Sequence, residues 1–345
     1  MALSQFNYFF LFVISYALVG LLTPVMRKIA IAQGVLDRPN SAHKSHKKPV
    51  PYLGGVAIIV GVVLVSYLAI ISSKFTWSNF WLATFVLGPA VVMGLVGLWD
   101  DLKNLNPLPR FIGQSIAGLI VAIILVVNDN VGNPTGIIGL DVAITVLWIV
   151  GICNSINFFD NLDGGAAGTV AITAISLTYL AITGNQYFIA ALSVVLAGAT
   201  LGFLIWNRTP ARIYMGDAGA LFLGVLIATL TVRFKPSTGN SISSFALPIL
   251  LLAIPILDTS VAVISRVRRK VSPFQGGKDH LSHRLVRYGL SRKASAIMLW
   301  LLSALYGFFA VLISMQNINY EFLIIIISST IWILLFVIFL STKDE

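Results

Sequence analysis

The sequence predicts an all-α protein that crosses a membrane many times, and three observations support this fold class. Hydrophobic residues make up 57% of the 345 residues, and charged residues make up only 10%. Soluble domains carry about 25% charged residues, so the composition excludes an ordinary soluble enzyme. The third observation is that apolar stretches of the bilayer-spanning length, ~20 residues, follow one another along the chain. We therefore expect a single transmembrane domain over residues 1–345.

Eleven apolar stretches are expected to form membrane-spanning helices, and ten result if one neighbouring pair is merged. The first stretch lacks the preceding basic residues and the following cleavage site of a signal peptide, so we expect an uncleaved anchor. The eleven stretches are residues 6–24, 53–71, 79–98, 111–128, 140–157, 165–183, 186–206, 218–232, 244–265, 295–315 and 321–340.

The distribution of basic residues predicts how these spans are oriented. With the N-terminus outside, 20 of the 23 Lys and Arg residues lie on the inner side, and only Lys74, Arg233 and Lys235 lie outside. Positive residues concentrate in cytoplasmic loops, so we expect an outer N-terminus and a cytoplasmic C-terminus in the plasma membrane. The net charge of +10 then records orientation and does not indicate nucleic-acid binding.

Asp100 and Asp101 lie where the third stretch ends on the inner side. Adjacent carboxylates repel each other, so one of them is hard to ionise unless a cation lies near. A solvated helix end is the alternative interpretation. Because further acidic residues fall on the same expected face, we favour a site that contains a cation.

A polar stripe leaves the fifth stretch and ends in a glycine turn. Asn154, Asn157, Asp160 and Asp163 follow at intervals of three residues, which places successive members on one helix face. Unpaired amides and carboxylates are costly at membrane depth, although a polar seam between helices is an alternative. Amide and carboxylate oxygens suit a hard cation or a nucleoside.

The segment from Tyr214 to Gly219 opens the eighth stretch. Asp217 in this segment can cap the helix, or it can hold a metal ion that bridges to a phosphate. The second interpretation gains support from the helix N-terminus, which favours anions.

Two His-x-x-His pairs lie in inner loops, His43 with His46 and His280 with His283. We reject a zinc site, because lysines surround the first pair and Cys153 is the single cysteine of the chain. Imidazoles beside basic residues suit phosphate groups. A basic loop attracted to anionic lipid headgroups is the alternative.

Together these segments combine oxygen ligands for Mg²⁺ with basic groups for phosphates. Phosphoryl transfer needs this combination, because the protein mainly neutralises charge and positions the reactants. A membrane transporter is the alternative from another class. Transporters place charged groups near the bilayer midplane, whereas here only Asp258 lies within an expected span.

These segments resemble the polyprenyl-phosphate N-acetylhexosamine-1-phosphate transferases, in the bacterial undecaprenyl-phosphate N-acetylglucosaminyl-1-phosphate transferase branch of glycosyl transferase family 4. The resemblance implies Mg²⁺-dependent transfer, with Mn²⁺ as a substitute, of a sugar 1-phosphate from a UDP-N-acetylhexosamine to polyprenyl phosphate. UMP is released at a cytoplasmic site, and lipid-linked cell-wall or surface glycan synthesis begins. The matching pieces, in the family's order, are residues 49–55, 100–101, 154–164, 215–219, 255–258 and 280–285.

The resemblance also implies roles for individual residues. Asp217 and Asn157 are expected to hold the metal ion. Asp100 is expected to deprotonate the lipid phosphate or to attack directly, with Asp101 beside it as the second catalytic acid. Tyr214 can stack on uracil. The expected substrate-binding residues are Asn154, Asn157, Asp160, Asp163, Tyr214, Arg110, His46, His280, His283 and Arg284.

The chain departs from the family pattern at several positions. Asn161 stands where glycine is usual, Ser282 interrupts what is commonly a histidine pair, Arg110 replaces a lysine, and Tyr52 replaces a basic residue. Within the enzyme class, a phospho-N-acetylmuramoyl-pentapeptide transferase remains the alternative, although that branch is usually assigned ten spans. The expected partners are the UDP-sugar, the polyprenyl phosphate, the membrane and, as an open case, a second copy of the chain.

Overall fold

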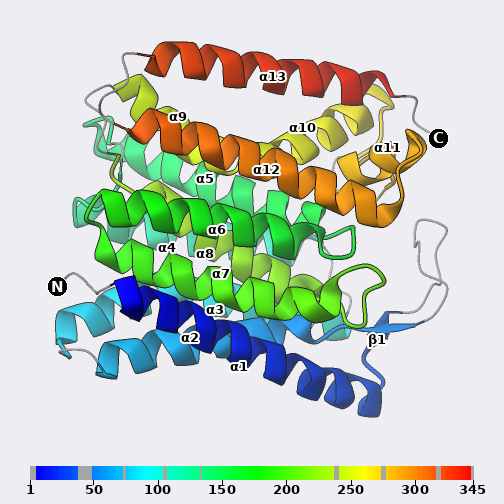
Figure 1. Cartoon of the computed structure of the whole chain (residues 1–345), viewed down its shortest axis with the longest axis horizontal. Helices are drawn as coiled ribbons and strands as arrows, with labels where there is room; N and C mark the ends of the chain where they lie inside the picture. The colour runs from blue at the N-terminus through cyan, green and yellow to red at the C-terminus, as the bar shows by residue number, and fades with distance from the viewer. Residues whose placement is uncertain are drawn as a thin grey trace.

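The structure is a computed structural model that describes residues 5–37, 49–72, 75–103, 107–132, 134–236, 241–272, 277–315 and 320–342. Within these ranges it contains thirteen helices and a two-stranded antiparallel sheet, and most of the helices run side by side (Figure 1). The all-α fold class is therefore confirmed. The elements are α1 (Gln5–Ala32), β1 (Leu36–Asp37), β2 (Val50–Pro51), α2 (Gly54–Ser72), α3 (Trp77–Lys103), α4 (Pro107–Val127), α5 (Ile138–Phe159), α6 (Gly165–Thr183), α7 (Tyr187–Asn207), α8 (Gly216–Arg233), α9 (Ser241–Leu251), α10 (Ala253–Arg268), α11 (Leu281–Arg287), α12 (Arg292–Ser314) and α13 (Glu321–Ser341).

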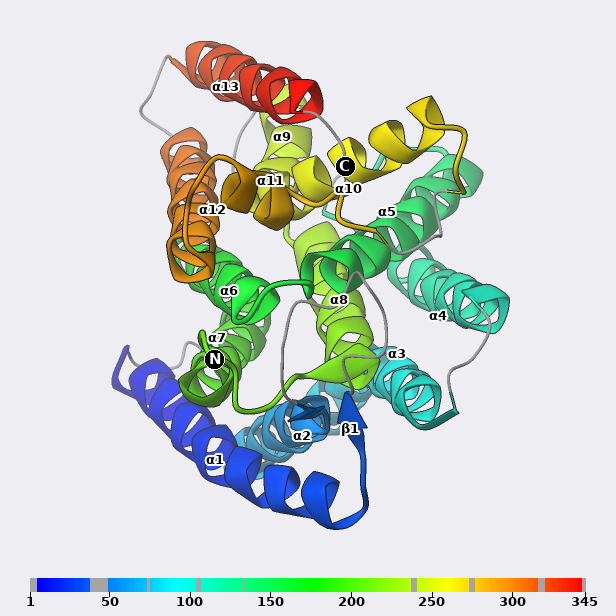
Figure 2. The same ribbon diagram turned by 90° about the vertical axis from the view of Figure 1, so that its right-hand side faces the viewer.

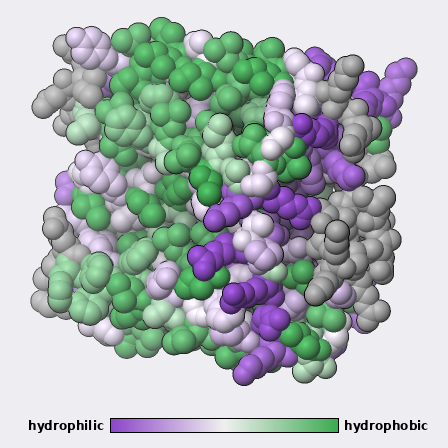
Figure 3. Space-filling view, turned by 45° about the vertical axis from the view of Figure 1, so that its right-hand side comes forward, coloured by the Kyte–Doolittle hydropathy of each residue, from purple (hydrophilic) through white to green (hydrophobic). Residues whose placement is uncertain are grey.

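The helices are long and apolar enough for a multi-pass membrane protein. Ten of them could each cross a bilayer, and the number rises to eleven if the bent pair α9 and α10 forms one span. Both numbers agree with the sequence-based count. On the face that Figure 3 shows, hydrophobic residues cover most of the flank, while hydrophilic residues gather toward the end that carries α11 and β1. We call this end the polar end.

The ninth expected span, residues 244–265, is broken rather than continuous. Its two parts, α9 and α10, meet at an angle of 74°. Pro255 lacks the N–H that would bond to the carbonyl oxygen of Leu251 within a continuous helix. That oxygen instead accepts a hydrogen bond of 2.9 Å from Thr173 Oγ1. A freed backbone group is thus satisfied by a neighbouring helix, as a membrane interior requires, and α10 turns to pack against α5 (Figure 2).

Helix α8 lies at the centre of the bundle, between α3, α5 and α2 (Figure 2). Every residue from Ala218 to Thr231 is buried. A helix that is apolar on all sides is either buried among other helices or exposed to lipid, and the burial of these residues assigns α8 to the first case. The first turn of α8 consequently emerges in the middle of the polar end.

Two glycines allow neighbouring helices to approach this first turn closely. A Cβ atom on Gly55 of α2 would lie 2.2 Å from the backbone nitrogen of Gly219. A Cβ atom on Gly97 of α3 would lie 2.3 Å from the carbonyl oxygen of Asp217. Small residues permit such close packing of membrane helices. The end of α3, with Asp100 and Asp101, is therefore held beside the start of α8.

Candidate active site

The carboxylates of Asp100 and Asp217 converge on one side-chain nitrogen at the polar end. Arg110 Nη1, from the first turn of α4, lies 2.7 Å from Asp100 Oδ2 and 2.6 Å from Asp217 Oδ2. The side chains of Arg110 and Asp217 are about a quarter exposed (25% and 28%), so the cluster is accessible. Because the Arg110 guanidinium balances the charges of both carboxylates, a metal ion at the same position would be stabilised by the same two groups.

Asp101 caps helix α8 from the neighbouring helix. Its Oδ1 and Oδ2 atoms accept hydrogen bonds from the backbone N–H groups of Asp217 (2.9 Å) and Ala218 (3.1 Å). The residue that precedes α8 provides no side-chain cap. The interpretation of Asp217 as the cap of its own helix is therefore wrong. The Asp217 carboxylate is instead directed to Arg110 and to Asn157.

The polar stripe at the end of α5 divides between two environments. Asn157 Nδ2 donates to Asp217 Oδ1 over 2.7 Å, which places Asn157 in the carboxylate cluster. Asn154, one turn earlier, donates to Gln114 Oε1 over 2.6 Å and thus joins α5 to α4. Gln114 is missing from the sequence-based candidates. A single amide side chain in an apolar membrane helix indicates a hydrogen-bond partner on another helix. Gln114 could therefore have been selected from the sequence.

Asp160 and Asp163 lie in the turn that follows α5. Burial raises the pKa of the Asp160 carboxyl well above its usual range, and the charges of Asp217 and Asp101 raise that pKa further. These three carboxyls therefore share a region in which a bound cation is favourable. Asp163 Oδ2 accepts a hydrogen bond of 3.0 Å from the backbone N–H of Ala211, which ties this turn to the segment before α8.

Tyr214 lies in the segment before α8, half-buried and near the same turn. Burial raises the pKa of its phenol, and the charge of Asp163 adds to this rise. The backbone of Tyr214 pairs with that of Tyr52, and Tyr52 Oη donates to the carbonyl oxygen of Asp101 over 2.7 Å. Tyr214 is therefore positioned beside the carboxylate cluster, where its stacking on a base remains a prediction.

His280 is oriented by a buried hydrogen-bond network at the N-terminus of α11. Its Nδ1 lies 2.7 Å from Asp258 Oδ2, and Asp258 Oδ1 accepts the backbone N–H of Leu281 over 2.7 Å. Its Nε2 lies 3.2 Å from Arg266 Nη2. Because a guanidinium only donates, Nε2 is the acceptor and Nδ1 carries the proton. Asp258 and Arg266 thus fix both the ring and its tautomer.

His283 and Arg284, which follow Ser282 in α11, lie in different environments. Burial and, to a smaller extent, the nearby His280 lower the pKa of the His283 imidazole to about 4. Arg284 is fully buried and donates to the carbonyl oxygens of Asp279 and Phe339. This position favours a structural role for Arg284, and its contact with substrate remains a prediction. His46, like His43, lies outside the described residues.

The last turn of α5 and the turn that follows it connect the histidine network with the carboxylate cluster. The ring of Phe158 contacts that of His280 edge-on, with centroids 5.9 Å apart. Ser282 Oγ donates to Asn161 Oδ1, and Asp160 interacts electrostatically with Asp217. The structure therefore brings both groups of residues to one continuous face of the polar end.

The chemistry of the donors at Asp217 fits Mg²⁺. Within the described ranges, no three His, Cys, Asp or Glu side chains lie close enough together to hold a metal ion by themselves. Mg²⁺ commonly binds through one or two carboxylates and the phosphates of the substrate, and it keeps several water ligands. Asp217 supplies one carboxylate, and Asp100 faces the same point. The Asn157 amide can present its oxygen instead of its nitrogen by a flip.

The chain is similar to known proteins over nearly its whole length. The model of glycosyl transferase family 4 matches residues 82–235. A probable undecaprenyl-phosphate N-acetylglucosaminyl 1-phosphate transferase of Bacillus subtilis is 32% identical, over 95% of this chain and 87% of the relative. A decaprenyl-phosphate N-acetylglucosaminephosphotransferase of Mycolicibacterium smegmatis is 33% identical, over 83% and 79%. A phospho-N-acetylmuramoyl-pentapeptide-transferase of Streptococcus uberis is 30% identical, over 55% and 61%.

Proposed function

The chain belongs to the polyprenyl-phosphate N-acetylglucosamine-1-phosphate transferases of glycosyl transferase family 4, and we propose that its donor is UDP-N-acetylglucosamine. In the proposed reaction, an oxygen of polyprenyl phosphate attacks the phosphorus that carries the sugar. The bond from this phosphorus to the bridging oxygen breaks, and UMP leaves. The product is a polyprenyl diphosphate that carries N-acetylglucosamine.

The observation that carries the proposed phosphoryl transfer is the convergence of Asp100 and Asp217 on one cationic nitrogen. A cation at this point can balance the negative charges of the donor's pyrophosphate and of the lipid phosphate beside it. Mg²⁺, when bound, would neutralise the negative charge that develops on the phosphoryl oxygens. Asp217 and Asn157 would hold the metal ion, and Arg110 would then be available to bind a phosphate oxygen. Asp100 accepts a proton from the lipid phosphate.

The histidine network supplies the second half of the proposed site. Asp258 and Arg266 hold His280 in one orientation, and Ser282 ties the start of α11 to the turn that carries Asp160. His283 is neutral at neutral pH and can donate a hydrogen bond to a phosphate oxygen. Asp160, Asp163 and Tyr214 form the adjoining wall, which suits the uridine. The cytoplasmic position of this face and the plasma membrane location remain part of the proposal.

The choice of donor rests on the extent of the similarity. The relatives named for N-acetylglucosamine transfer match 95% and 83% of this chain, whereas the relative named for muramoyl-pentapeptide transfer matches 55%. The muramoyl-pentapeptide donor is therefore the second candidate. The structure offers ten or eleven spans, so the number of helices does not separate the two donors.

A donor screen tests the proposal. The purified protein is incubated with undecaprenyl phosphate, Mg²⁺ and one of the two UDP-linked donors, and release of UMP is measured. We expect turnover with UDP-N-acetylglucosamine, loss of turnover on chelation of the metal ion, and partial recovery with Mn²⁺. Asp217→Asn serves as the inactive control, because the amide removes the charged ligand while Asp101 still caps α8. Turnover of the muramoyl-pentapeptide donor alone would overturn the assignment.

A further inference from the structure

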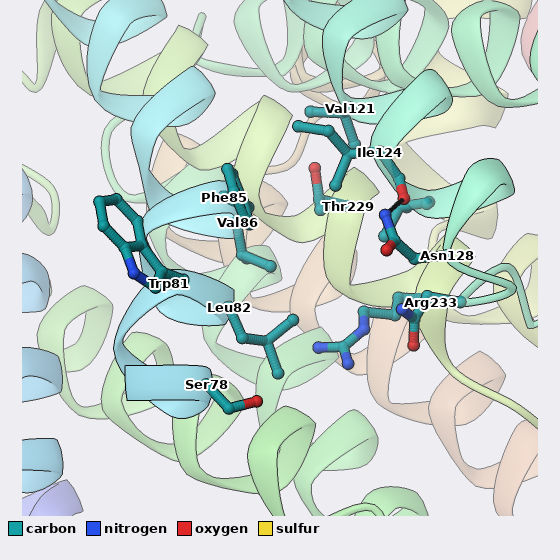
Figure 4. A pocket seen from close by; sticks show the side chains of 12 residues that line it. Ser78, Trp81, Leu82, Phe85, Val86, Val121, Ile124, Asn128, Thr229 and Arg233 are labelled. Carbon is teal, nitrogen blue, oxygen red and sulfur yellow. Dashed lines mark hydrogen bonds between the residues drawn. The ribbon is translucent and has the colours of Figure 1, made fainter. Parts of the chain in front are cut away.

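A cavity lies at the end of the bundle opposite the polar end. It has a volume of about 400 Å³ and lies between the first turns of α3, the last turns of α4 and the end of α8 (Figure 4). This volume falls within the range of small-molecule sites, roughly 300–1,000 Å³. Leu82, Phe85 and Ile124 contribute to apolar walls, and the polar groups include Asn128 and Arg233. Nothing in the proposed reaction uses these residues.

Arg233 brings an incompletely satisfied positive charge to this cavity. It is the last residue of α8, and its side chain extends toward Leu82 on α3 (Figure 4). Its guanidinium carbon lies 4.8 Å from the centroid of the Phe188 ring. Its Nη1 atom is buried and, among the described residues, has no hydrogen-bond acceptor. The Phe188 ring and the α8 dipole stabilise the charge in part, but neither provides the acceptor that a buried N–H group requires.

The residues around the cavity indicate which kind of molecule could supply a hydrogen-bond acceptor to Arg233. Trp81 and Phe85, which line the cavity on α3, are 50% and 46% exposed on the surface of an apolar helix. Tryptophan is enriched at the level of the lipid headgroups. The cavity therefore combines apolar walls with a cation at the end of a span, close to the expected depth of lipid phosphates.

We propose that this cavity binds the phosphate of an anionic lipid from the leaflet opposite the candidate active site. Arg233 holds the phosphate through Nη1, and Asn128 lines the same cavity. One aliphatic chain packs along Leu82, Phe85 and Ile124. The apolar walls favour a lipid over a free phosphate ion, because an ion would leave these walls without a partner.

Lipid nanodiscs of two compositions test this proposal. The protein is placed in phosphatidylcholine alone or in phosphatidylcholine with phosphatidylglycerol, and two quantities are measured: the thermal midpoint, and the phosphatidylglycerol retained in native mass spectrometry. A ligand that binds only the folded state raises the midpoint. We expect the wild type to retain phosphatidylglycerol and to gain stability from it. Arg233→Gln should bind this lipid at least about tenfold more weakly, since a hydrogen bond to a charged group is worth about 1.5–3 kcal/mol.

Two further variants make the result specific. Leu82→Trp fills the cavity but keeps Arg233, and it should also lose the gain in stability. Lys235→Gln removes the same charge two residues further on, from an exposed side chain that bonds to the carbonyl oxygen of Asp129, and it should behave as the wild type. Equal lipid dependence in the wild type, Arg233→Gln and Leu82→Trp would overturn the proposal. So would an equal loss in Lys235→Gln, or an equal gain in stability from inorganic phosphate alone.

Discussion

Ser282 of α11 donates a hydrogen bond to Asn161 in the turn after α5, across 121 positions of the chain. Both residues stand at positions where the resemblance implies other residue types, and the structure places them in contact with each other. Asn161 Nδ2 also donates to the carbonyl oxygen of Phe158 over 2.6 Å. Ser282 and Asn161 therefore form one interaction, which holds α11 against the turn that carries Asp160.

This contact predicts coupling between the two positions. Asn161→Ala and Ser282→Ala should each lower kcat/KM for the UDP-sugar, and the double variant should lose little more than either single variant. Residues in direct contact typically show coupling energies of about 0.5–3 kcal/mol. Steady-state kinetics of the four proteins measure this energy. Ser291→Ala is the matched control, because Ser291 Oγ accepts from Ala294 N at the start of α12. Additive losses at positions 161 and 282 would contradict the prediction.

The membrane spans of this protein, and the polar residues that lie within or beside them, can be predicted from sequence patterns. Membrane spans are recognisable from composition and length alone, and a carboxylate beside such a span is conspicuous. Asp100, Asp101, Asn157, Asp160 and Asp217 can therefore be grouped from their positions along the chain. The similarity to known transferases supports the enzyme class to which this grouping points.

Features that depend on pairing between distant segments cannot be predicted in this way. The cap of α8 comes from Asp101, 116 positions earlier in the chain, because two helices meet at Gly97. The separation of Asn154 from Asn157 depends on Gln114 of another helix. Arg284 belongs to the predicted motif of residues 280–285 but donates a hydrogen bond to the carbonyl oxygen of Phe339, near the end of α13. Helical periodicity places side chains on one face but does not say what that face contacts.

Arg110 is predicted to substitute for a metal ion in the resting cluster. Arg110→Gln leaves Asp100 and Asp217 without their shared cation, so repulsion between the carboxylates should lower the free energy of unfolding by roughly 1–2 kcal/mol, allowing for partial exposure. Added Mg²⁺ should recover more stability in the variant than in the wild type. Thermal midpoints measured across a Mg²⁺ titration test this. The same Mg²⁺ response in both proteins would show that the ion binds elsewhere.

His283 predicts a specific dependence of stability on pH. Its pKa is about 4 in the folded protein, below the ordinary value of 6.5. Between these values the unfolded chain binds more protons at this residue, so its contribution to stability is lost as pH falls from 6.5 to 4. His283→Gln cannot titrate, and the variant should lose less stability than the wild type in this window. The difference between the two proteins should be constant above about pH 7. A difference that stays constant from about pH 4 to about pH 8 would exclude the lowered pKa.

The orientation of the bundle is predicted by the bias of 20 to 3 in basic residues. A reporter fused after Glu345 should be cytoplasmic, and a reporter inserted between Pro236 and Ser241 should be external. Accessibility to an impermeant label in intact cells distinguishes the two sides. An external signal from the C-terminal fusion would reverse the assignment of the polar end.

Asp100 is predicted to act on the acceptor phosphate. It lies near the end of α3, beside the position expected for the lipid headgroup, and its carboxylate pairs with Arg110. A polyprenyl monophosphate loses its second proton with a pKa of ~6, by analogy with phosphorylated side chains. Below this pH a base helps to expose the attacking oxygen, and above it the oxygen is already free. Asp100→Asn should therefore lower turnover by about 10²–10⁴-fold.

The pH profile of the Asp100→Asn variant separates the two roles that this acid can have. If Asp100 is a general base, the loss should shrink as pH rises well above ~6; if it is a covalent nucleophile, the loss should persist at every pH. We expect the first result, with affinities for Mg²⁺ and UDP close to those of the wild type. Asp217→Asn is the contrasting variant, because it should lose Mg²⁺ affinity itself. A matching loss of Mg²⁺ affinity in Asp100→Asn would make Asp100 a metal ligand, since both carboxylates already face one cation.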